Sequence, residues 1–355
     1  MSVKNGLWFW IIGLFIGCLI LYFLHSMLLP FVVGMMIAYL LNPQVKRLER
    51  LGLSRTITTV IITFSFFLIV VLTIIIVLPL LEEQLIDFVR KIPEYVHRFI
   101  KRCEPLWKIT TTYFSVDIDQ LHSISGKYAG TIATWVVNIV SNLLTGSLAF
   151  INIISLILIT PAVTFYLLRD WDKFTKCFDD LLPRNHLKTI RIQLYEIDST
   201  LAGFIRGQFL VCLVLSIFYA ISLTLVGLDL GLIVGLVSGI FSFIPYLGTI
   251  IGLIAGVGIS LAQSQDWTLV AMVTFVFVGG NLLEGNILSP KLVGEKIGLH
   301  PVWIIFALLT GWTLCGFFGI LIALPVAAIA GVLIRFTFGQ YLQSSLYSND
   351  RDFIS

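Results

Sequence analysis

Two apolar tracts in this chain are too long to cross a lipid bilayer once as straight helices. Residues 230–262 would extend about 50 Å at 1.5 Å per residue, against a hydrocarbon core of about 30 Å, and residues 301–336 would extend further. Each tract has a proline near its middle, Pro245 in the first and Pro325 in the second. Because proline removes a backbone hydrogen bond inside a helix, we expect broken or re-entrant helices around these two prolines, as in many transporters.

The composition restricts the class of protein. Hydrophobic residues make up 58% of the 355 positions and charged residues only 12%, whereas soluble domains are about 25% charged. The mean hydropathy is +0.98. We therefore expect an all-α, polytopic integral membrane protein. The net charge of +3, without any run rich in Lys and Arg, argues against a nucleic-acid partner.

Residues 1–81 are expected to contain the N-terminal transmembrane helices. The apolar runs at residues 7–24 and 57–81 are long enough to span the bilayer, and the shorter run at 31–41 is expected to cross obliquely or only in part. Residues 44–55 carry four basic residues against one acid. The positive-inside rule places this short loop in the cytoplasm.

A water-facing region follows at residues 82–148. Its early part repeats apolar residues near helical spacing, which predicts amphipathic helices on the extracytoplasmic side. Two interpretations remain open: helices that lie on the bilayer or on the transmembrane body, and an external oligomerisation or gating domain. The other expected regions are a transmembrane helix at 149–168, a cytoplasmic helical loop at 169–206, a C-terminal transmembrane core with two broken segments at 207–336, and a cytoplasmic tail at 337–355.

The connector between the two long tracts, residues 281–301, is polar and interrupted by glycine and proline. If both tracts fold as hairpins, residues 290–300 lie on the cytoplasmic side together with the C-terminus. If both are single tilted spans, those residues lie outside. Lys291, Lys296 and Arg335 favour the hairpins by the positive-inside rule.

Glu284 is the most unusual residue of this connector. It ends an apolar run, in a position where hydrocarbon surroundings make a carboxylate costly. We interpret Glu284 as a candidate proton or cation relay, with Asn286 beside it in the transport path. The alternative is an interfacial carboxylate that simply faces water.

Further candidate residues lie at the breaks and at the start of the fifth span. Tyr246 and Gly248 follow Pro245, where open backbone groups and aromatic side chains could hold a small polar solute and glycine permits a close approach. Close helix packing by small residues is the alternative. Arg206, next to Gln208, either anchors the span at the interface or contacts a substrate. The candidate path is therefore Glu284, Asn286, Pro245, Tyr246, Gly248, Pro325, Arg206 and Gln208.

Motifs of other functional classes are missing from the sequence. It contains no Walker loop, no HExxH and no GxSxG, and its five histidines have no metal-ligand spacing. None of its five cysteines forms a CxxC pair. We therefore expect transport that this chain does not drive with ATP, no enzyme activity, and no cofactor or metal.

A set of short motifs follows in one order along nearly the whole chain. The most telling are Phe243-Ile-Pro-Tyr-Leu-Gly248, Glu284-Gly-Asn-Ile-Leu-Ser-Pro290 and Gly298-Leu-His-Pro301. With them the chain resembles the autoinducer-2 exporter family of bacterial inner-membrane proteins. The resemblance implies about eight transmembrane segments, a homo-oligomer and export of small molecules. Some members resemble exporters of quorum signals, and others resemble sodium/proton antiporters.

We predict a multi-pass transporter of the bacterial inner membrane. It would export a small polar solute, such as autoinducer-2 or a related metabolite, by ion-coupled or facilitated transport, with sodium ions or protons as the coupling ions. One alternative is a sodium/proton antiporter that uses Glu284. Another is a membrane scaffold that does not transport and acts through residues 82–148.

Overall fold

The computed structural model describes residues 28–111, 147–182, 184, 187–264, 266–293, 300–343 and 347. The expected first span at residues 7–24, residues 112–146 of the water-facing region, residues 294–299 of the connector and most of the expected tail lie outside these ranges. The regular structure in the described part is helical, and five of its helices are long and apolar enough to cross a membrane. The prediction of an all-α polytopic membrane protein is confirmed.

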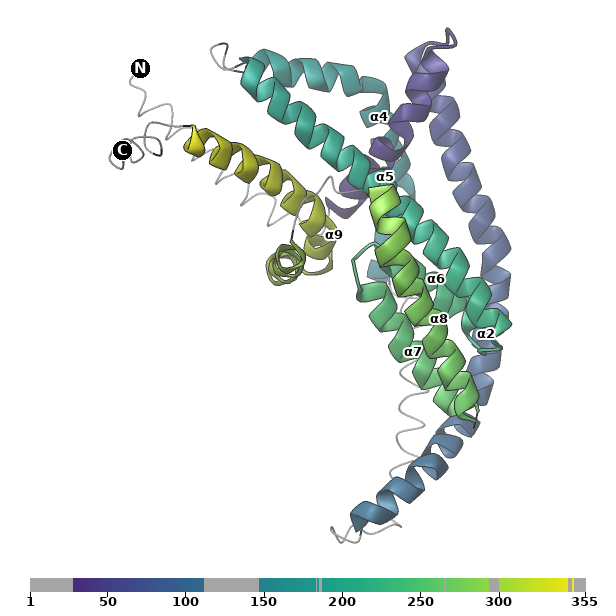
Figure 1. Cartoon of the computed structure of the whole chain (residues 1–355). Helices are drawn as coiled ribbons and strands as arrows, with labels where there is room; N and C mark the ends of the chain where they lie inside the picture. The colour runs from purple at the N-terminus through teal and green to yellow at the C-terminus, as the bar shows by residue number, and fades with distance from the viewer. Residues whose placement is uncertain are drawn as a thin grey trace, which may run out of the picture. The chain divides into compact units, whose positions relative to one another are not determined.

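Helices α2 and α4 to α9 are labelled in Figure 1. In chain order the helices are a helix at Leu28–Glu49, α2 (Arg55–Thr111), α4 (Ser147–Leu181), α5 (Leu187–Leu225), α6 (Gly231–Phe241), α7 (Leu247–Gln263), α8 (Trp267–Leu283), the π-helix η2 (Glu284–Val293) and α9 (Pro301–Leu342). The chain divides into two compact units. Unit 1 comprises Met1–Phe66, Ser155–Gly207 and Val293–Ser355, and unit 2 comprises Phe67–Ile154 and Gln208–Leu292.

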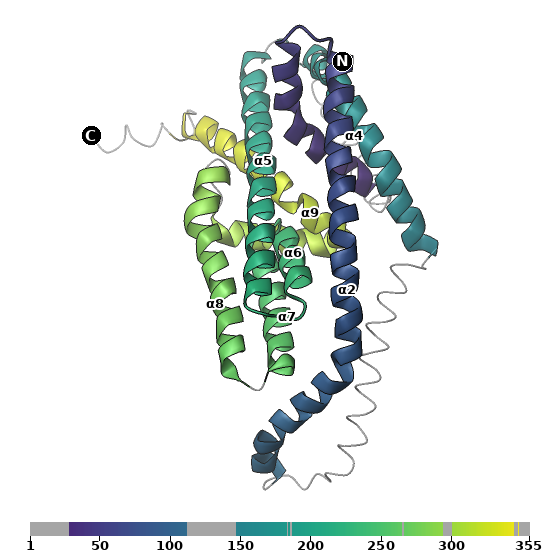
Figure 2. The same cartoon turned by 90° about the vertical axis from the view of Figure 1, so that its right-hand side faces the viewer.

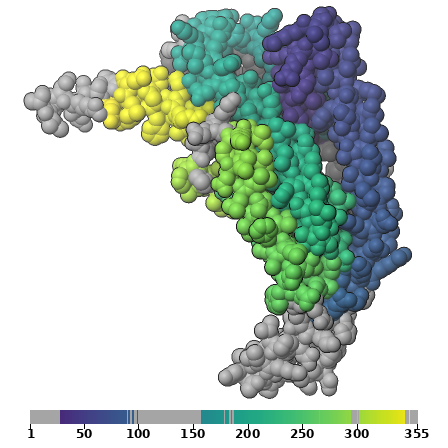
Figure 3. Space-filling view, turned by 45° about the vertical axis from the view of Figure 1, so that its right-hand side comes forward, coloured from purple at the N-terminus to yellow at the C-terminus, as the bar shows by residue number. Residues whose placement is uncertain are grey.

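Helix α2 is continuous over 57 residues, so it extends about 85 Å at 1.5 Å per residue. It therefore contains both the expected span at 57–81 and the described beginning of the region 82–148. Apolar side chains are exposed along most of its first half, and the blue helix lies at the surface in the space-filling view (Figure 3). Such a surface suits contact with lipid, because hydrocarbon imposes no penalty on apolar side chains.

The core of unit 1 is built on the helix Leu28–Glu49. Its residues Ala38, Leu41 and Val45 pack with Leu168 of α4, and all four are nearly inaccessible to solvent. Just beyond Leu168, the Asp170 carboxylate accepts hydrogen bonds from Arg169 and Lys173, which lower the pKa of Asp170 to about 2. This pair of bonds keeps the carboxylate ionised where α4 leaves the apolar core.

Arg55 is the first residue of α2, and its side chain binds to this core. Its Nε and Nη2 atoms both donate to the Leu168 carbonyl oxygen, at 3.1 and 3.0 Å, and its Nη1 pairs with Asp172.

We expect Arg55→Met to lower the free energy of unfolding by about 2 kcal/mol, because the charged hydrogen bonds are lost while the aliphatic stem remains. Thermal unfolding in detergent measures this. Arg184→Met, at an exposed ion pair with Asp180, should change stability by less than about 0.5 kcal/mol.

The second long tract is a hairpin whose turn does not lie at the proline. The backbone of α9 leaves helical geometry at Cys315 and Gly316, and Gly316 has a positive φ of 59°. The helix continues through Pro325, so our placement of this break at Pro325 was wrong by about ten residues. The two arms touch at Gly311 and Gly319, where a Cβ on Gly311 would lie 2.4 Å from the Gly319 carbonyl oxygen.

The first long tract breaks at the expected proline. Helix α6 ends at Phe241, residues 242–246 turn, and α7 begins at Leu247, with Tyr246 in the left-handed region at φ 68°. The 11 residues of α6 extend only about 16 Å, about half of the hydrocarbon core. Helix α6 is therefore too short to cross the bilayer by itself, which fits the expected re-entrant hairpin with its tip at membrane depth.

Glycines allow the re-entrant hairpin to pack backbone to backbone within unit 2. A Cβ on Gly239 of α6 would lie 2.2 Å from the Ser216 Cα of α5, and one on Gly252 of α7 would lie 2.3 Å from the Phe277 ring of α8. Helix α7 packs against both α6 and α8, as Figures 1 and 2 show. Close packing by small residues, which we raised as an alternative for this region, is thus realised.

The base of the hairpin is fixed to the second half of α2. The Asp229 carboxylate, in the turn before α6, pairs with Lys91 at 3.1 Å and accepts a hydrogen bond from the Tyr95 hydroxyl. Gln263, at the end of α7, accepts from the Asp229 backbone N–H at 3.0 Å, and Arg98 donates to the Gln263 carbonyl at 2.6 Å. Both ends of the hairpin are therefore held by one polar network.

Candidate functional site

One face of α8 points into unit 2 and ends in an acid. Val273, Phe277, Gly280 and Glu284 follow at helical spacing, and all four are buried. At Glu284 the α-helix passes into the ten-residue π-helix η2. Short π-helical segments inside longer helices occur often at functional sites. The helix therefore places a carboxylate on an otherwise apolar, inward-facing stripe.

Glu284 is only 8% exposed. No ion pair or hydrogen bond links its carboxylate to any residue that the structure describes. One turn before Glu284 on the same face, Gly280 packs against the Tyr219 ring of α5. The burial of the carboxylate does not fit the alternative in which Glu284 simply faces water. A buried charge without a partner is costly, so the site has a strong tendency to take up a proton or a cation.

Tyr219 links the buried stripe of α8 to the first turn of α7. Its ring is fully buried and lies 4.9 Å from the Phe277 ring, centroid to centroid, and its hydroxyl lies 3.4 Å from the Thr249 hydroxyl. Thr249 belongs to the N-terminal turn of α7, whose Tyr246 cap makes no side-chain hydrogen bond. The N–H groups of that turn carry the positive end of the helix dipole. Tyr219 thus lies between the buried stripe of α8, which ends at Glu284, and the N-terminal turn of α7.

Gln208 holds the tip of the hairpin from α5. Its side-chain nitrogen donates to the Ser242 carbonyl oxygen at 2.6 Å, and both residues are at most 5% exposed. Ser242 lies just past the end of α6, where carbonyl groups lose their helical partners. Broken helices at membrane depth require such replacement partners. Gln208 therefore has a structural role at the site besides any contact with a solute.

The packing of Gly280 against Tyr219 leads to a testable expectation. A Cβ on Gly280 would lie 2.3 Å from the Tyr219 ring and 2.4 Å from its hydroxyl, whereas a Cβ on the neighbouring Gly279 would meet nothing within 4 Å. We expect Gly280→Ala to lower the free energy of unfolding by about 2 kcal/mol, because the ring must move. Gly279→Ala should be neutral or slightly stabilising. Thermal unfolding of both variants in detergent measures the difference, and equal midpoints would contradict this packing.

The structure brings together some of the predicted path residues and separates others. Pro245, Tyr246, Gly248, Gln208 and Glu284 all belong to unit 2, at or near the hairpin tip. Asn286 also belongs to unit 2, but its side chain is exposed on η2.

Arg206 and Pro325 belong to unit 1. The Arg206 Nε donates to the Tyr39 carbonyl oxygen at 3.2 Å, and Pro325 lies inside the second arm of α9. Whether either residue lines a transport path stays a prediction.

Sequence reasoning missed several residues of the site. Tyr219, Thr249, Ser238 and Ser242 were not singled out, although the serines are four residues apart and wholly buried. The glycine spacing Gly248, Gly252 and Gly256 was the available signal, since such repeats mark helix faces that pack closely.

Among the described residues, no group of three or more His, Cys, Asp or Glu side chains could hold a metal ion.

Comparison with known proteins agrees with the family resemblance. The model of the AI-2E family transporter matches residues 9–339 of the chain. YrrI of Bacillus subtilis, described as a candidate transport protein, is 29% identical over 310 residues, which cover 87% of this chain and 86% of YrrI. PerM of Escherichia coli K12, described as a candidate permease, is 26% identical over 89% of each chain. The AI-2 transport protein TqsA of the same strain is 24% identical over 89% of this chain and 88% of TqsA.

Proposed function

We propose, for a chain that belongs to the AI-2E family of transporters, that it exports a small polar solute and that Glu284 couples this movement to a proton or a sodium ion. The observation that carries the proposal is the Glu284 carboxylate, buried and without a partner among the described residues, beside the tip of a re-entrant hairpin. Such carboxylates within transmembrane helices commonly serve ion pathways and proton relays.

The surrounding groups suit a solute with hydroxyl and carbonyl groups. The N–H groups in the first turn of α7 can donate to a solute oxygen, and the Tyr219 hydroxyl can donate or accept. Glu284 can accept from a solute hydroxyl when it is ionised and can donate when it is protonated. Binding of a proton or cation at Glu284 therefore changes which hydrogen bonds the site offers, and this difference couples the ion to the solute.

Autoinducer-2 is the first solute to test, because one relative is named as an AI-2 transport protein. Liposomes that are loaded with autoinducer-2 and carry the purified chain should release it faster than loaded liposomes without protein. An imposed proton or sodium gradient should change the rate of release. If gradients have no effect on release, transport is facilitated rather than coupled.

A sodium/proton antiporter is the second candidate, favoured by the same unpaired carboxylate. It predicts acidification or alkalinisation of liposomes in response to a sodium gradient without any organic solute. The absence of both fluxes would favour the non-transporting scaffold that acts through residues 82–148.

We further propose a homo-oligomer in the bacterial inner membrane. The bacterial sources of the relatives support the location, and the homo-oligomer is what the family resemblance implies. Mass measurement of the protein in lipid nanodiscs tests the oligomeric state.

A further inference from the structure

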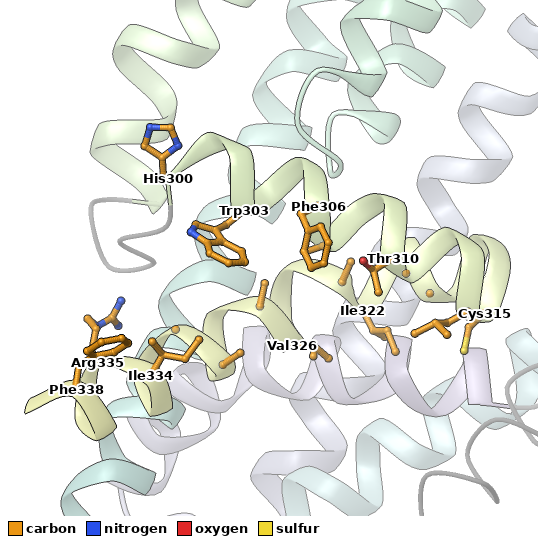
Figure 4. A pocket seen from close by; sticks show the side chains of 18 residues that line it. His300, Trp303, Phe306, Thr310, Cys315, Ile322, Val326, Ile334, Arg335 and Phe338 are labelled. Carbon is orange, nitrogen blue, oxygen red and sulfur yellow. The ribbon is translucent and has the colours of Figure 1, made fainter. Parts of the chain in front are cut away.

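The two arms of α9 enclose an apolar cleft within unit 1. The cleft has a volume of about 670 Å³ and is closed at one end by the contact between Gly311 and Gly319. Its walls carry apolar side chains from both arms, including Trp303 and Phe306 on the first arm and Ile334 on the second (Figure 4). The cleft therefore narrows toward the turn of the hairpin and is wider at the other end.

Two hydrophilic residues, His300 and Arg335, line the end of the cleft that lies away from the turn. His300 precedes the first arm and Arg335 lies on the second, and apart from Thr310 the other lining residues are not hydrophilic (Figure 4). The His300 Nδ1 accepts from the Val302 backbone N–H, which leaves its Nε2 for another partner. Trp303 lies one turn farther into the cleft. Basic residues and tryptophan near the ends of apolar helices are typical of the membrane–water interface, and here they are Arg335 and Trp303.

We propose that this cleft binds one anionic phospholipid, with its phosphate at Arg335 and an acyl chain between the arms of α9. An amphiphile of this kind matches both parts of the cleft, since the guanidinium complements the phosphate and the apolar walls complement the chain. A guanidinium forms bidentate hydrogen bonds with phosphate oxygens. Basic pockets between transmembrane helices are established sites for anionic headgroups.

The length of the first arm fits a lipid of one leaflet. Residues 301–315 extend about 22 Å, which exceeds the half-thickness of the hydrocarbon core, about 15 Å. An acyl chain that enters beside Trp303 can therefore lie along the arm for its full length. The positive-inside rule predicts the cytoplasmic leaflet, where anionic lipids create a negative surface potential.

Glu196 of α5 competes for the same cation. Its carboxylate lies 3.9 Å from an Arg335 Nη atom, at the limit of an ion pair, and both side chains are almost half exposed. A phosphate at Arg335 has to tolerate or displace this carboxylate. Removing the charge of Glu196 should therefore strengthen the binding of an anionic lipid.

Trp303 offers a direct readout, because brominated acyl chains quench tryptophan fluorescence on contact. The full chain is placed in nanodiscs of phosphatidylcholine with a minor share of dibrominated phosphatidylglycerol or dibrominated phosphatidylcholine. The difference between the natural chain and Trp303→Phe isolates this tryptophan from the other seven. We expect half-maximal quenching of Trp303 at about fivefold less phosphatidylglycerol than phosphatidylcholine. Arg335→Gln should abolish this preference, Glu196→Gln should increase it, and Arg184→Gln should leave it unchanged.

Ala330→Phe tests the apolar part of the cleft separately, because it fills the space and keeps Arg335. It should reduce the quenching by every brominated lipid.

Equal quenching by both lipids, or a preference that survives Arg335→Gln, would overturn the proposal. Displacement of the lipid by glycerol 3-phosphate would show a site for soluble anions instead. Quenching that disappears as the protein density rises would show that a second copy of the chain covers the cleft, which also overturns it.

Discussion

Glu284→Gln is expected to abolish the response of transport to an ion gradient. Glutamine keeps the shape and the polarity of the side chain, but it can neither bind a proton nor balance a cation. We expect gradient-driven flux in liposomes to fall by at least about tenfold, which corresponds to ~1.4 kcal/mol of lost coupling. Passive release of solute down its own gradient should persist, because the hairpin and the Tyr219 hydroxyl remain in place.

Asp266→Asn is the matched control for this variant. Asp266 is the exposed residue at the opposite end of the same helix, and asparagine caps a helix as well as aspartate does. It should transport at the natural rate. If Glu284→Gln responds to gradients as strongly as Asp266→Asn does, the coupling group lies elsewhere. The thermal unfolding midpoint of each variant distinguishes a lost function from a lost fold.

Gly248→Ala is expected to open the tip of the re-entrant hairpin. A Cβ on Gly248 would lie 2.2 Å from the Ser238 carbonyl oxygen and 2.4 Å from the Ser242 hydroxyl, both on the α6 side of the turn. Because these atoms are buried and fixed, we expect a loss of about 3 kcal/mol in the free energy of unfolding, together with loss of transport. The Ser242 carbonyl would also move away from Gln208.

Gly258→Ala, ten residues along the same helix, provides the comparison. A Cβ there meets nothing within 4 Å, so the substitution should raise stability slightly, by up to about 1 kcal/mol, through helix propensity. Thermal unfolding in detergent and flux in liposomes measure both variants. Similar effects at the two glycines would mean that the hairpin is not packed as the structure shows.

The sequence predicted that both long tracts bend, and it located one bend correctly. At Pro245 the missing N–H coincides with the turn, so the proline marked the break. In the second tract the chain turns at Gly316, where a positive φ is needed, and α9 accommodates Pro325 without a break. Composition could not distinguish these cases, because whether proline ends a helix depends on how neighbouring groups satisfy the freed carbonyl.

The candidate site was only partly visible from the sequence. Glu284 stood out because a carboxylate follows an apolar run, but its burial depends on the α8 stripe that turns it toward α5. Asn286, two residues later, is exposed on η2. Tyr219 lies in an apolar span like many other aromatic residues, and only the close approach of Gly280 shows its position. These features arise from tertiary packing, which a local pattern does not encode.

The most direct test is the number of protons that the purified chain exchanges when its ligand binds. Sodium ions, and separately autoinducer-2, are added to the protein in weakly buffered detergent solution while the pH is recorded. Glu284 is fully protonated before the ligand is added. If Glu284 is the coupling group, at least one of these ligands should cause a proton exchange, and the number of protons exchanged should approach one per chain. The exchange should be the same for the natural chain and Asp266→Asn and absent for Glu284→Gln. An equal exchange in all three proteins would contradict the assignment of Glu284 as the coupling group.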